Sequence, residues 1–193
     1  MPEKAKKFLN DLITEKAFLN FLEQRKEFLD GVVISGWEPT LQKDLYEFVK
    51  KIKDMWFLVK IDTNGRDPKL IRKMIDEKLI DYVAMDIKNP IKKYDRIVNA
   101  EFNKNDILET IAILLEGKID YEFRTTVVKW VHSEQDIEDM ARLVEWAKKY
   151  YLQNYQNKNI LNDFFEWESF SLEELRTLKK IAEKHVEKCN IRS

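Results

Sequence analysis

Glycine, cysteine and long apolar runs are all scarce in this sequence. Its 193 residues include 4 glycines, where average usage would give about 13. The single cysteine, Cys189, excludes a disulfide within the chain and a metal site built from cysteines alone. No apolar run approaches the roughly 18 residues of a membrane-spanning helix, and no signal peptide is recognisable. We therefore expect a cytoplasmic protein without membrane contact.

An excess of charge of one sign is also missing. The 34 Lys and Arg residues nearly balance the 35 Asp and Glu residues, although 36% of the chain is charged. Without a basic excess, we expect no nucleic-acid partner. Tryptophan, with 5 residues, is by contrast well represented. A βα protein that binds cofactors through its loops ordinarily needs more glycine than this chain has.

Apolar runs alternate with segments of helical periodicity along the chain. Strands are expected at residues 32–35, 57–61, 82–87, 121–128, 150–155 and 186–191, and helices at 14–29, 41–53, 68–77, 106–116 and 133–149 with another from residue 171. Asp67, Ser133 and Ser171 are the predicted N-caps. Strands alternating with helices in this way indicate an α/β fold with a parallel sheet. Because no low-complexity linker interrupts the chain, we expect one domain over residues 1–193.

Polar or charged side chains stand at the carboxyl ends of the first five strands. They are Glu38 after the first strand, Asp62, Thr63 and Asn64 after the second, Asp86, Lys88 and Asn89 after the third, Arg124 late in the fourth, and Asn154, Gln156 and Asn157 after the fifth. Ligands of parallel α/β folds bind at this edge. Each residue alone has a simpler explanation as a cap, a turn or an ion pair, such as one between Asp86 and Lys88. The set as a whole predicts a ligand-binding rim.

Four stretches carry a family resemblance: VVISGWEPTLQKDLYEF, VKIDTNG, YVAMDIKNP and EFRTTVV. In their order and spacing they resemble the activating enzymes of anaerobic ribonucleotide reductase and related glycyl-radical enzyme activases, in the radical S-adenosylmethionine (radical SAM) superfamily. The resemblance runs from about residue 14 to the end of the chain. It implies a partial (β/α) barrel that holds S-adenosylmethionine against a [4Fe–4S] cluster. It also implies a glycyl-radical enzyme, such as anaerobic ribonucleotide reductase, as partner.

The resemblance further implies the residues that contact the cofactor. The family's Gly-Gly-Glu-Pro loop, which meets the methionyl amino group, corresponds to residues 36–39. Its Asp-x-Lys motif corresponds to Asp86 and Lys88, and its strand-four arginine to Arg124. The implied cofactor-binding set is Gly36, Trp37, Glu38, Asn64, Asp86, Lys88 and Arg124. A zwitterionic amino acid can bind a carboxylate with its ammonium group and a cation with its carboxylate, if the two side chains are held at a fixed separation.

The first departure from the family pattern concerns the cluster. The family's C-x-x-x-C-x-x-C loop follows a first strand that would lie upstream of residue 1. Cys189 cannot replace three thiolates. We therefore expect an incomplete parallel barrel with its first strand missing, no metal ligands, no catalytic residue of its own and no activity of this chain alone. Its interior is expected to be filled by Val33, Ile34, Val59, Val83 and Val127.

The second departure concerns glycine positions. Trp37 replaces the second glycine of the cofactor loop, Trp56 stands before the second strand where the family has glycine, and Lys129-Trp130 follows the fourth strand where the family tends to have Pro-Gly. We expect Trp37 to weaken S-adenosylmethionine binding. Its indole would either fill the methionine position or swing outward on a backbone angle that costs about 1 kcal/mol or more.

Three hypotheses about function remain open at this stage. The first is an activase that lacks its cluster segment through truncation, a split gene or a misassigned start. The second is a catalytically silent βα domain that binds a protein or a nucleotide. The third, an unrelated small βα hydrolase, is disfavoured because no nucleophile elbow, phosphate loop or His-Glu-x-x-His motif occurs. His132 and His185 are isolated, which is typical of surface or capping residues and not of a metal site.

Overall fold

Six parallel strands form one sheet in the computed structural model, which describes residues 13–96, 103–156 and 167–192. The strands are β1 (Gly31–Ile34), β2 (Leu58–Thr63), β3 (Tyr82–Asp86), β4 (Asp120–Val127), β5 (Tyr150–Asn154) and β6 (Cys189–Arg192). Each strand pairs in parallel with the next one along the chain. The predicted parallel α/β sheet is therefore confirmed.

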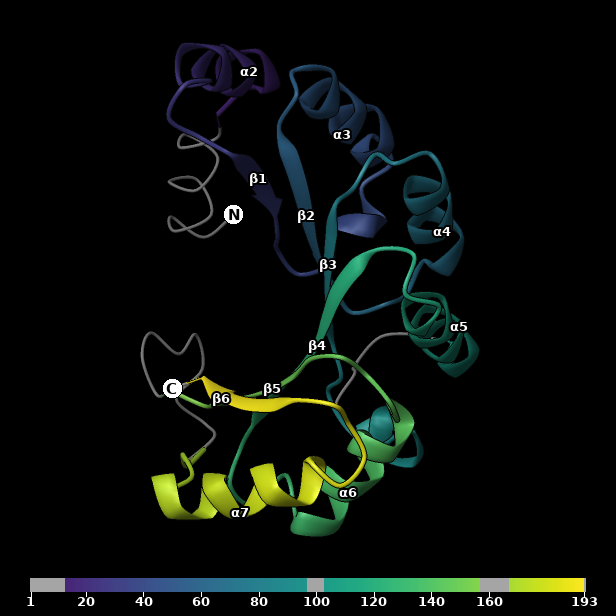
Figure 1. The fold of residues 1–193 in the computed structure, drawn as a ribbon, viewed down its shortest axis with the longest axis vertical. Helices are drawn as coiled ribbons and strands as arrows, with labels where there is room; N and C mark the ends of the chain where they lie inside the picture. The colour runs from purple at the N-terminus through teal and green to yellow at the C-terminus, as the bar shows by residue number, and fades with distance from the viewer. Residues whose placement is uncertain (1–12, 97–102, 157–166, 193) are drawn as a thin grey trace, which may run out of the picture.

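The helices lie along one side of this sheet, and the sheet curves away from them (Figure 1). They are α2 (Glu15–Gln24), α3 (Leu45–Asp54), α4 (Pro68–Asp76), α5 (Lys104–Leu115), α6 (Glu134–Leu143) and α7 (Leu172–Ala182), with short 3₁₀ helices η1 (Pro39–Leu41) and η2 (Ile91–Arg96). The strands β1 and β6 stand at opposite ends of the arc (Figure 1). Among the described strands, β1 pairs only with β2, so the arrangement is the expected open, partial barrel.

Side-chain caps fix where several helices begin. The Asp67 carboxylate accepts a hydrogen bond of 2.9 Å from the Leu70 N–H at the start of α4. Ser133 with Asp136, and Ser171 with Glu174, form complete capping boxes on α6 and α7. These caps satisfy N–H groups that the first turn of a helix leaves without partners. The three predicted N-caps are thus confirmed.

The hydrophobic core lies between the sheet and the helices, and not inside the partial barrel. Val59, Val83 and Val127 are fully buried and belong to the apolar cluster shared with the helices. Val33, by contrast, is 58% exposed and lies in register with Lys60 of β2. Because strand side chains alternate between faces, the residues between the buried ones face the concave side. The prediction of an apolar barrel interior is therefore wrong.

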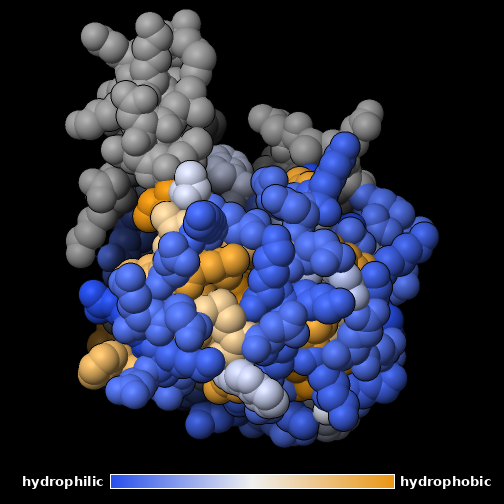
Figure 2. Space-filling view, turned by 90° about the horizontal axis from the view of Figure 1, so that it is seen from above, coloured by the Kyte–Doolittle hydropathy of each residue, from blue (hydrophilic) through white to orange (hydrophobic). Residues whose placement is uncertain are grey.

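The outer surface is dominated by charged side chains. Seen from the end that carries α2 and α3, hydrophilic residues cover most of the molecule, and apolar side chains show only in patches between them (Figure 2). This surface agrees with a chain in which 36% of the residues are charged. Within the described residues, no helix is long and apolar enough to cross a membrane.

Asp136 connects two elements of the fold from a buried position, with 2% of its surface exposed. It accepts hydrogen bonds from the Ser133 N–H at 3.0 Å and from the Lys93 ammonium of η2 at 2.6 Å. Burial raises the pKa of Asp136, but the hydrogen bonds from Lys93 and Ser133 outweigh it and leave the pKa below its ordinary value. The ionised carboxylate therefore stabilises the folded state.

We expect Asp136→Asn to lower the free energy of unfolding by about 1–3 kcal/mol at neutral pH, because it weakens charge-assisted hydrogen bonds. Since the folded-state pKa is lowered, this stabilisation is complete above the ordinary pKa range of aspartate and is lost as the pH falls through the folded-state value. Urea unfolding at pH 7 and in acid should show the two proteins converging on acidification. Asp139→Asn on the same helix is the control, expected within about 0.5 kcal/mol of wild type. A difference that stays constant with pH would contradict this account.

Candidate functional site

Arg124 of β4 joins three neighbouring strands on the concave face. Its Nε atom lies 2.6 Å from Asp86 Oδ1 of β3, and its Nη1 atom lies 3.1 Å from Asp62 Oδ2 of β2. Burial lowers the pKa of Arg124, but the two carboxylates, Asp86 first, raise it above its ordinary value. Arg124 is therefore a fixed cation between two anions at the carboxyl-end rim of the sheet.

Two lysines complete this rim. Lys88 Nζ lies 3.7 Å from Asp86 Oδ2, and Lys60 Nζ lies 3.5 Å from Asp62 Oδ1. Asp86, Lys88 and Arg124 thus converge as predicted, and the alternative in which Asp86 and Lys88 pair only with each other is excluded. With two carboxylates and three cations in contact, the rim offers partners for both ends of a zwitterion.

The charged network extends down the concave face to groups that sequence reasoning missed. Glu122 of β4, only 2% exposed, accepts two hydrogen bonds of 2.8 Å from Arg192 of β6 and one of 3.0 Å from the Tyr82 hydroxyl. Burial raises the pKa of Glu122, but Arg192 and Tyr82 lower it below its ordinary value. The signal was present in β2, where Lys60 and Asp62 alternate with buried apolar residues.

Glu38 ties the loop after β1 to the loop after β2. It is 6% exposed, and its Oε1 atom accepts hydrogen bonds from the Thr40 and Thr63 hydroxyls at 2.6 and 2.8 Å. Its Oε2 atom accepts the Asn64 N–H at 2.5 Å. Both carboxylate oxygens are thus engaged within the chain. Glu38 fixes the loop, which leaves the loop backbone as the part that can face a ligand.

Gly36 and Trp37 form the tip of this loop. Gly36 has a φ of +152°, and apart from its chain neighbours no atom of the described residues lies within 4 Å of where a Cβ would stand. The Trp37 side chain is 96% exposed, so the indole points into solvent and fills no inner position. Trp37 is also absent from the described residues with positive φ, so the expected backbone cost at this position is wrong.

Two buried amide oxygens at the strand ends have no hydrogen-bond partner among the described residues. They are Oδ1 of Asn64, after β2, and Oδ1 of Asn89, after β3. Buried acceptors without partners are uncommon, and such atoms are candidates for water or ligand contacts. Asn64 lies next to the loop that contains Glu38, because the Asn64 N–H donates a hydrogen bond to the Glu38 carboxylate. Its side-chain oxygen is therefore an available acceptor for an ammonium group.

The remaining polar residues of the predicted rim serve the fold or lie outside the site. Asn154 exchanges hydrogen bonds of 2.8 and 3.0 Å with the backbone of Phe170. Gln156 is exposed, and Asn157 lies outside the described residues. Neither Asn154 nor Gln156 joins the Arg124 network, so the fifth strand end contributes no group to it in the described part of the chain.

His132 also serves the fold. It is 6% exposed, so of the two expected roles, surface or capping, the surface one does not apply. Its Nδ1 atom accepts the Val128 N–H at 3.1 Å, which leaves Nε2 to donate to the Lys88 carbonyl at 3.0 Å. Burial lowers the pKa of His132, which favours this neutral tautomer. The ring thereby links the segments that follow β3 and β4.

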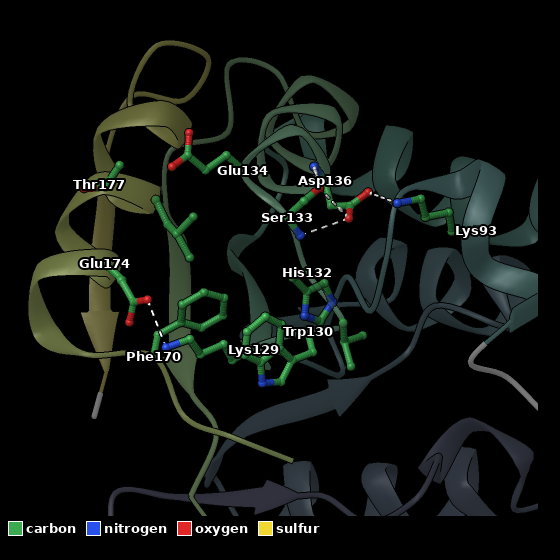
Figure 3. A pocket seen from close by; sticks show the side chains of 12 residues that line it. Lys93, Lys129, Trp130, His132, Ser133, Glu134, Asp136, Phe170, Glu174 and Thr177 are labelled. Carbon is green, nitrogen blue, oxygen red and sulfur yellow. Dashed lines mark hydrogen bonds and ion pairs between the residues drawn. The ribbon is translucent and has the colours of Figure 1, made fainter. Parts of the chain in front are cut away.

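A cavity of about 530 Å³, the α6–α7 cavity, lies between the N-terminal ends of α6 and α7 (Figure 3). Its two lysines already face carboxylates: Lys129 lies 3.1 Å from Glu174, and Lys93 lies 2.6 Å from Asp136. The rim, by contrast, places three cations, Lys60, Lys88 and Arg124, around Asp62 and Asp86. The rim is therefore the better candidate for a charged ligand.

The residues of this chain do not fit an iron–sulfur cluster. Cys189, the one cysteine, is 1% exposed, and burial raises the pKa of its thiol to about 12. A cubane cluster needs several accessible thiolates. The described residues contain no group of three His, Cys, Asp or Glu side chains that could hold a metal ion.

Known proteins share this sequence pattern and fold. The sequence model of the Radical SAM superfamily matches residues 4–147. A candidate glycyl-radical enzyme activating enzyme of Methanocaldococcus jannaschii is 42% identical over 172 residues, which cover 86% of this chain and 72% of that protein.

Solved structures agree on the fold. A domain of a pyruvate-formate lyase-activating enzyme from Bacteroides vulgatus superposes with a TM-score of 0.62 at 18% identity, over 84% of this chain and 99% of that one. Streptococcus suis SuiB bound to S-adenosylmethionine superposes with a TM-score of 0.71 at 15% identity, over 94% of this chain and 44% of that one. From the parallel partial barrel, the match over residues 4–147 and the close relative, we conclude that the chain belongs to the radical SAM superfamily and is homologous to a glycyl-radical enzyme activating enzyme.

Proposed function

We propose that this chain is the S-adenosylmethionine-binding part of a glycyl-radical enzyme activase. The observation that carries the proposal is the placement of Arg124 between Asp62 and Asp86, at the rim where parallel α/β folds bind ligands. The homology to an activating enzyme supports the same assignment. When bound in radical SAM enzymes, this cofactor supplies a carbon radical that abstracts a hydrogen atom.

The chemistry of the rim suits the methionyl end of the cofactor. Lys88 is the most accessible cation of the network, with 43% of its side chain exposed, and could reach a carboxylate together with Arg124. The unpartnered Asn64 oxygen and the backbone of residues 36–38 are available to an ammonium group. Charge-assisted contacts of this kind fix both position and orientation. We assign binding and orientation of the cofactor to these residues.

The proposed activase uses a [4Fe–4S] cluster, but the residues of this chain cannot hold it. The chain offers one buried thiol, so we assign no step of electron transfer to it and expect no activity from it alone. The proposed partner is a glycyl-radical enzyme, and the four motifs favour anaerobic ribonucleotide reductase. A catalytically silent domain that binds a protein or a nucleotide is the competing function.

Arg124→Gln should weaken S-adenosylmethionine binding by about 10- to 100-fold in calorimetric titration, because a hydrogen bond to a charged group contributes about 1.5–3 kcal/mol. Lys88→Gln, on a more exposed side chain, should cause a smaller loss without affecting folding. Arg72→Gln is the matched control, since Arg72 pairs with Glu116 away from the rim. Equal affinity of all four proteins, with the fold verified by circular dichroism, would reject the rim as the cofactor site.

The purified chain should bind no [4Fe–4S] cluster after anaerobic reconstitution, because one thiol cannot hold a cubane. Iron and sulfide analysis together with the visible absorbance spectrum measures this. Cys189→Ser serves as the control and should give the same spectrum as wild type. A stoichiometric cluster in the wild-type chain that the serine variant loses would overturn the assignment.

A further inference from the structure

All five tryptophans of the chain are unusually exposed. The exposed fractions are 96% for Trp37, 88% for Trp56, 80% for Trp130, 75% for Trp146 and 44% for Trp167. Indole side chains ordinarily bury most of their large apolar surface. Trp37 and Trp130 follow strands, whereas Trp56 and Trp146 precede them, so the four most exposed rings stand at opposite ends of the sheet. They do not form one surface that a partner or a ligand could cover.

Three of these tryptophans have a backbone conformation that favours glycine. The φ angles are 71° at Trp56, 70° at Trp130 and 66° at Trp146. In the left-handed region the Cβ atom of an L-residue approaches the following carbonyl oxygen, so a bulky side chain is rarely found there. Among the described residues, Lys78 is the one other non-glycine residue with positive φ. Three of the four described non-glycine residues with positive φ, a conformation that favours glycine, are therefore tryptophans.

The end of α3 shows the pattern against a reference within the same chain. The Trp56 N–H donates to the Lys53 carbonyl at 2.9 Å, just after the helix ends. After α5, the Gly117 N–H donates to the Leu114 carbonyl at 3.0 Å, with a φ of +70°. The two residues occupy the same place in the same helix-terminating motif, for which glycine is the usual residue. Gly117 holds this place after α5, Lys78 after α4 and Trp56 after α3.

The turn after β4 makes the same demand. The Val131 N–H donates to the Val128 carbonyl at 3.2 Å, which makes Trp130 the third residue of a β-turn. A positive φ at that position defines a type II turn, which requires glycine or asparagine there. The Trp130 side chain lines the α6–α7 cavity (Figure 3) and is 80% exposed, and its Nε1 atom donates a hydrogen bond of 2.9 Å to Glu168. Trp146, which follows α6, is held in the left-handed conformation while its N–H donates to the His185 carbonyl at 2.9 Å.

We propose that positions 37, 56, 130 and 146 are glycine in the protein made by its own organism. In this proposal the gene has UGA codons at these four positions, and the organism translates UGA as glycine. UGA is read as tryptophan in some genetic codes, and it differs from the glycine codon GGA only in its first base. The proposal explains together the exposure of the indoles, the left-handed backbone and the presence of only 4 glycines. Position 37 is included for its 96% exposure and its place directly after Gly36.

This inference rests on the backbone and not on the proposed function, but it has a consequence for the cofactor loop. With glycine at position 37, residues 36–38 present two successive residues without side chains, so a ligand can approach the loop backbone closely. The loop is then an intact binding element, and the weakening of cofactor binding expected from Trp37 does not apply to the natural protein.

Mass spectrometry of peptides from the protein purified from its own organism tests the proposal directly. Glycine at positions 37, 56, 130 and 146, together with UGA codons in the gene, is the expected result. Tryptophan in those peptides, or UGG codons at those positions, would overturn the proposal. The measurement is independent of S-adenosylmethionine binding, so its outcome does not depend on the proposed function.

Thermal unfolding of the tryptophan-containing chain tests the backbone argument. Trp56→Gly, Trp130→Gly and Trp146→Gly should each raise Tm by about 2–4 °C by removing the left-handed strain. Gly117→Trp, the reverse exchange at φ +70°, should lower Tm by a similar amount. Trp167→Gly is the matched control: its ring packs on Tyr155 at 5.4 Å and its φ is not positive, so Tm should fall. A fall in Tm for all three left-handed positions would contradict the inference.

Discussion

The salt bridges from Arg124 to Asp62 and Asp86 are the interaction on which the proposed site depends. They join three adjacent strands on a face that the helices do not cover. A partly buried cation must have anionic partners, which Asp62 and Asp86 provide. Each carboxylate also has a lysine nearby, Lys60 at 3.5 Å from Asp62 and Lys88 at 3.7 Å from Asp86. The same side chains that link the strands of the curved sheet can therefore also bind the charged groups of a zwitterionic ligand. Lys88 and the unpartnered Asn64 oxygen extend that capacity along the rim.

The glycine positions connect the backbone of the fold with the function of its loops. Left-handed residues end α3 and turn the chain after β4, and the loop after β1 is fixed from below by Glu38. A rigid loop with a bare backbone is a good binding element, whereas the same loop with an indole at its tip is a poorer one. Whether residue 37 is glycine or tryptophan therefore decides how closely a ligand can approach the best-anchored loop of the rim.

Periodicity and caps predicted the six strands, the N-caps at Asp67 and Ser133, and the edge of the sheet where polar groups gather. They could not predict which face of each strand the helices cover. An apolar residue such as Val33 has the same character as its partly buried neighbours Val32 and Ile34, although it lies in register with Lys60 on the open face. Nor could the sequence show that the Glu38 carboxylate accepts a hydrogen bond from the Thr63 hydroxyl, since Thr63 lies 25 residues away along the chain and contacts Glu38 only after folding.

A crystal structure of the chain with S-adenosylmethionine tests the central claim most directly. The account requires the methionyl carboxylate near Arg124 and Lys88, and the amino group near Asn64 and the backbone of residues 36–38. It also requires at least one of the two Arg124 salt bridges to lengthen as the ligand takes its place. Cofactor bound in the cavity between α6 and α7, with both Arg124 pairs unchanged, would contradict the account.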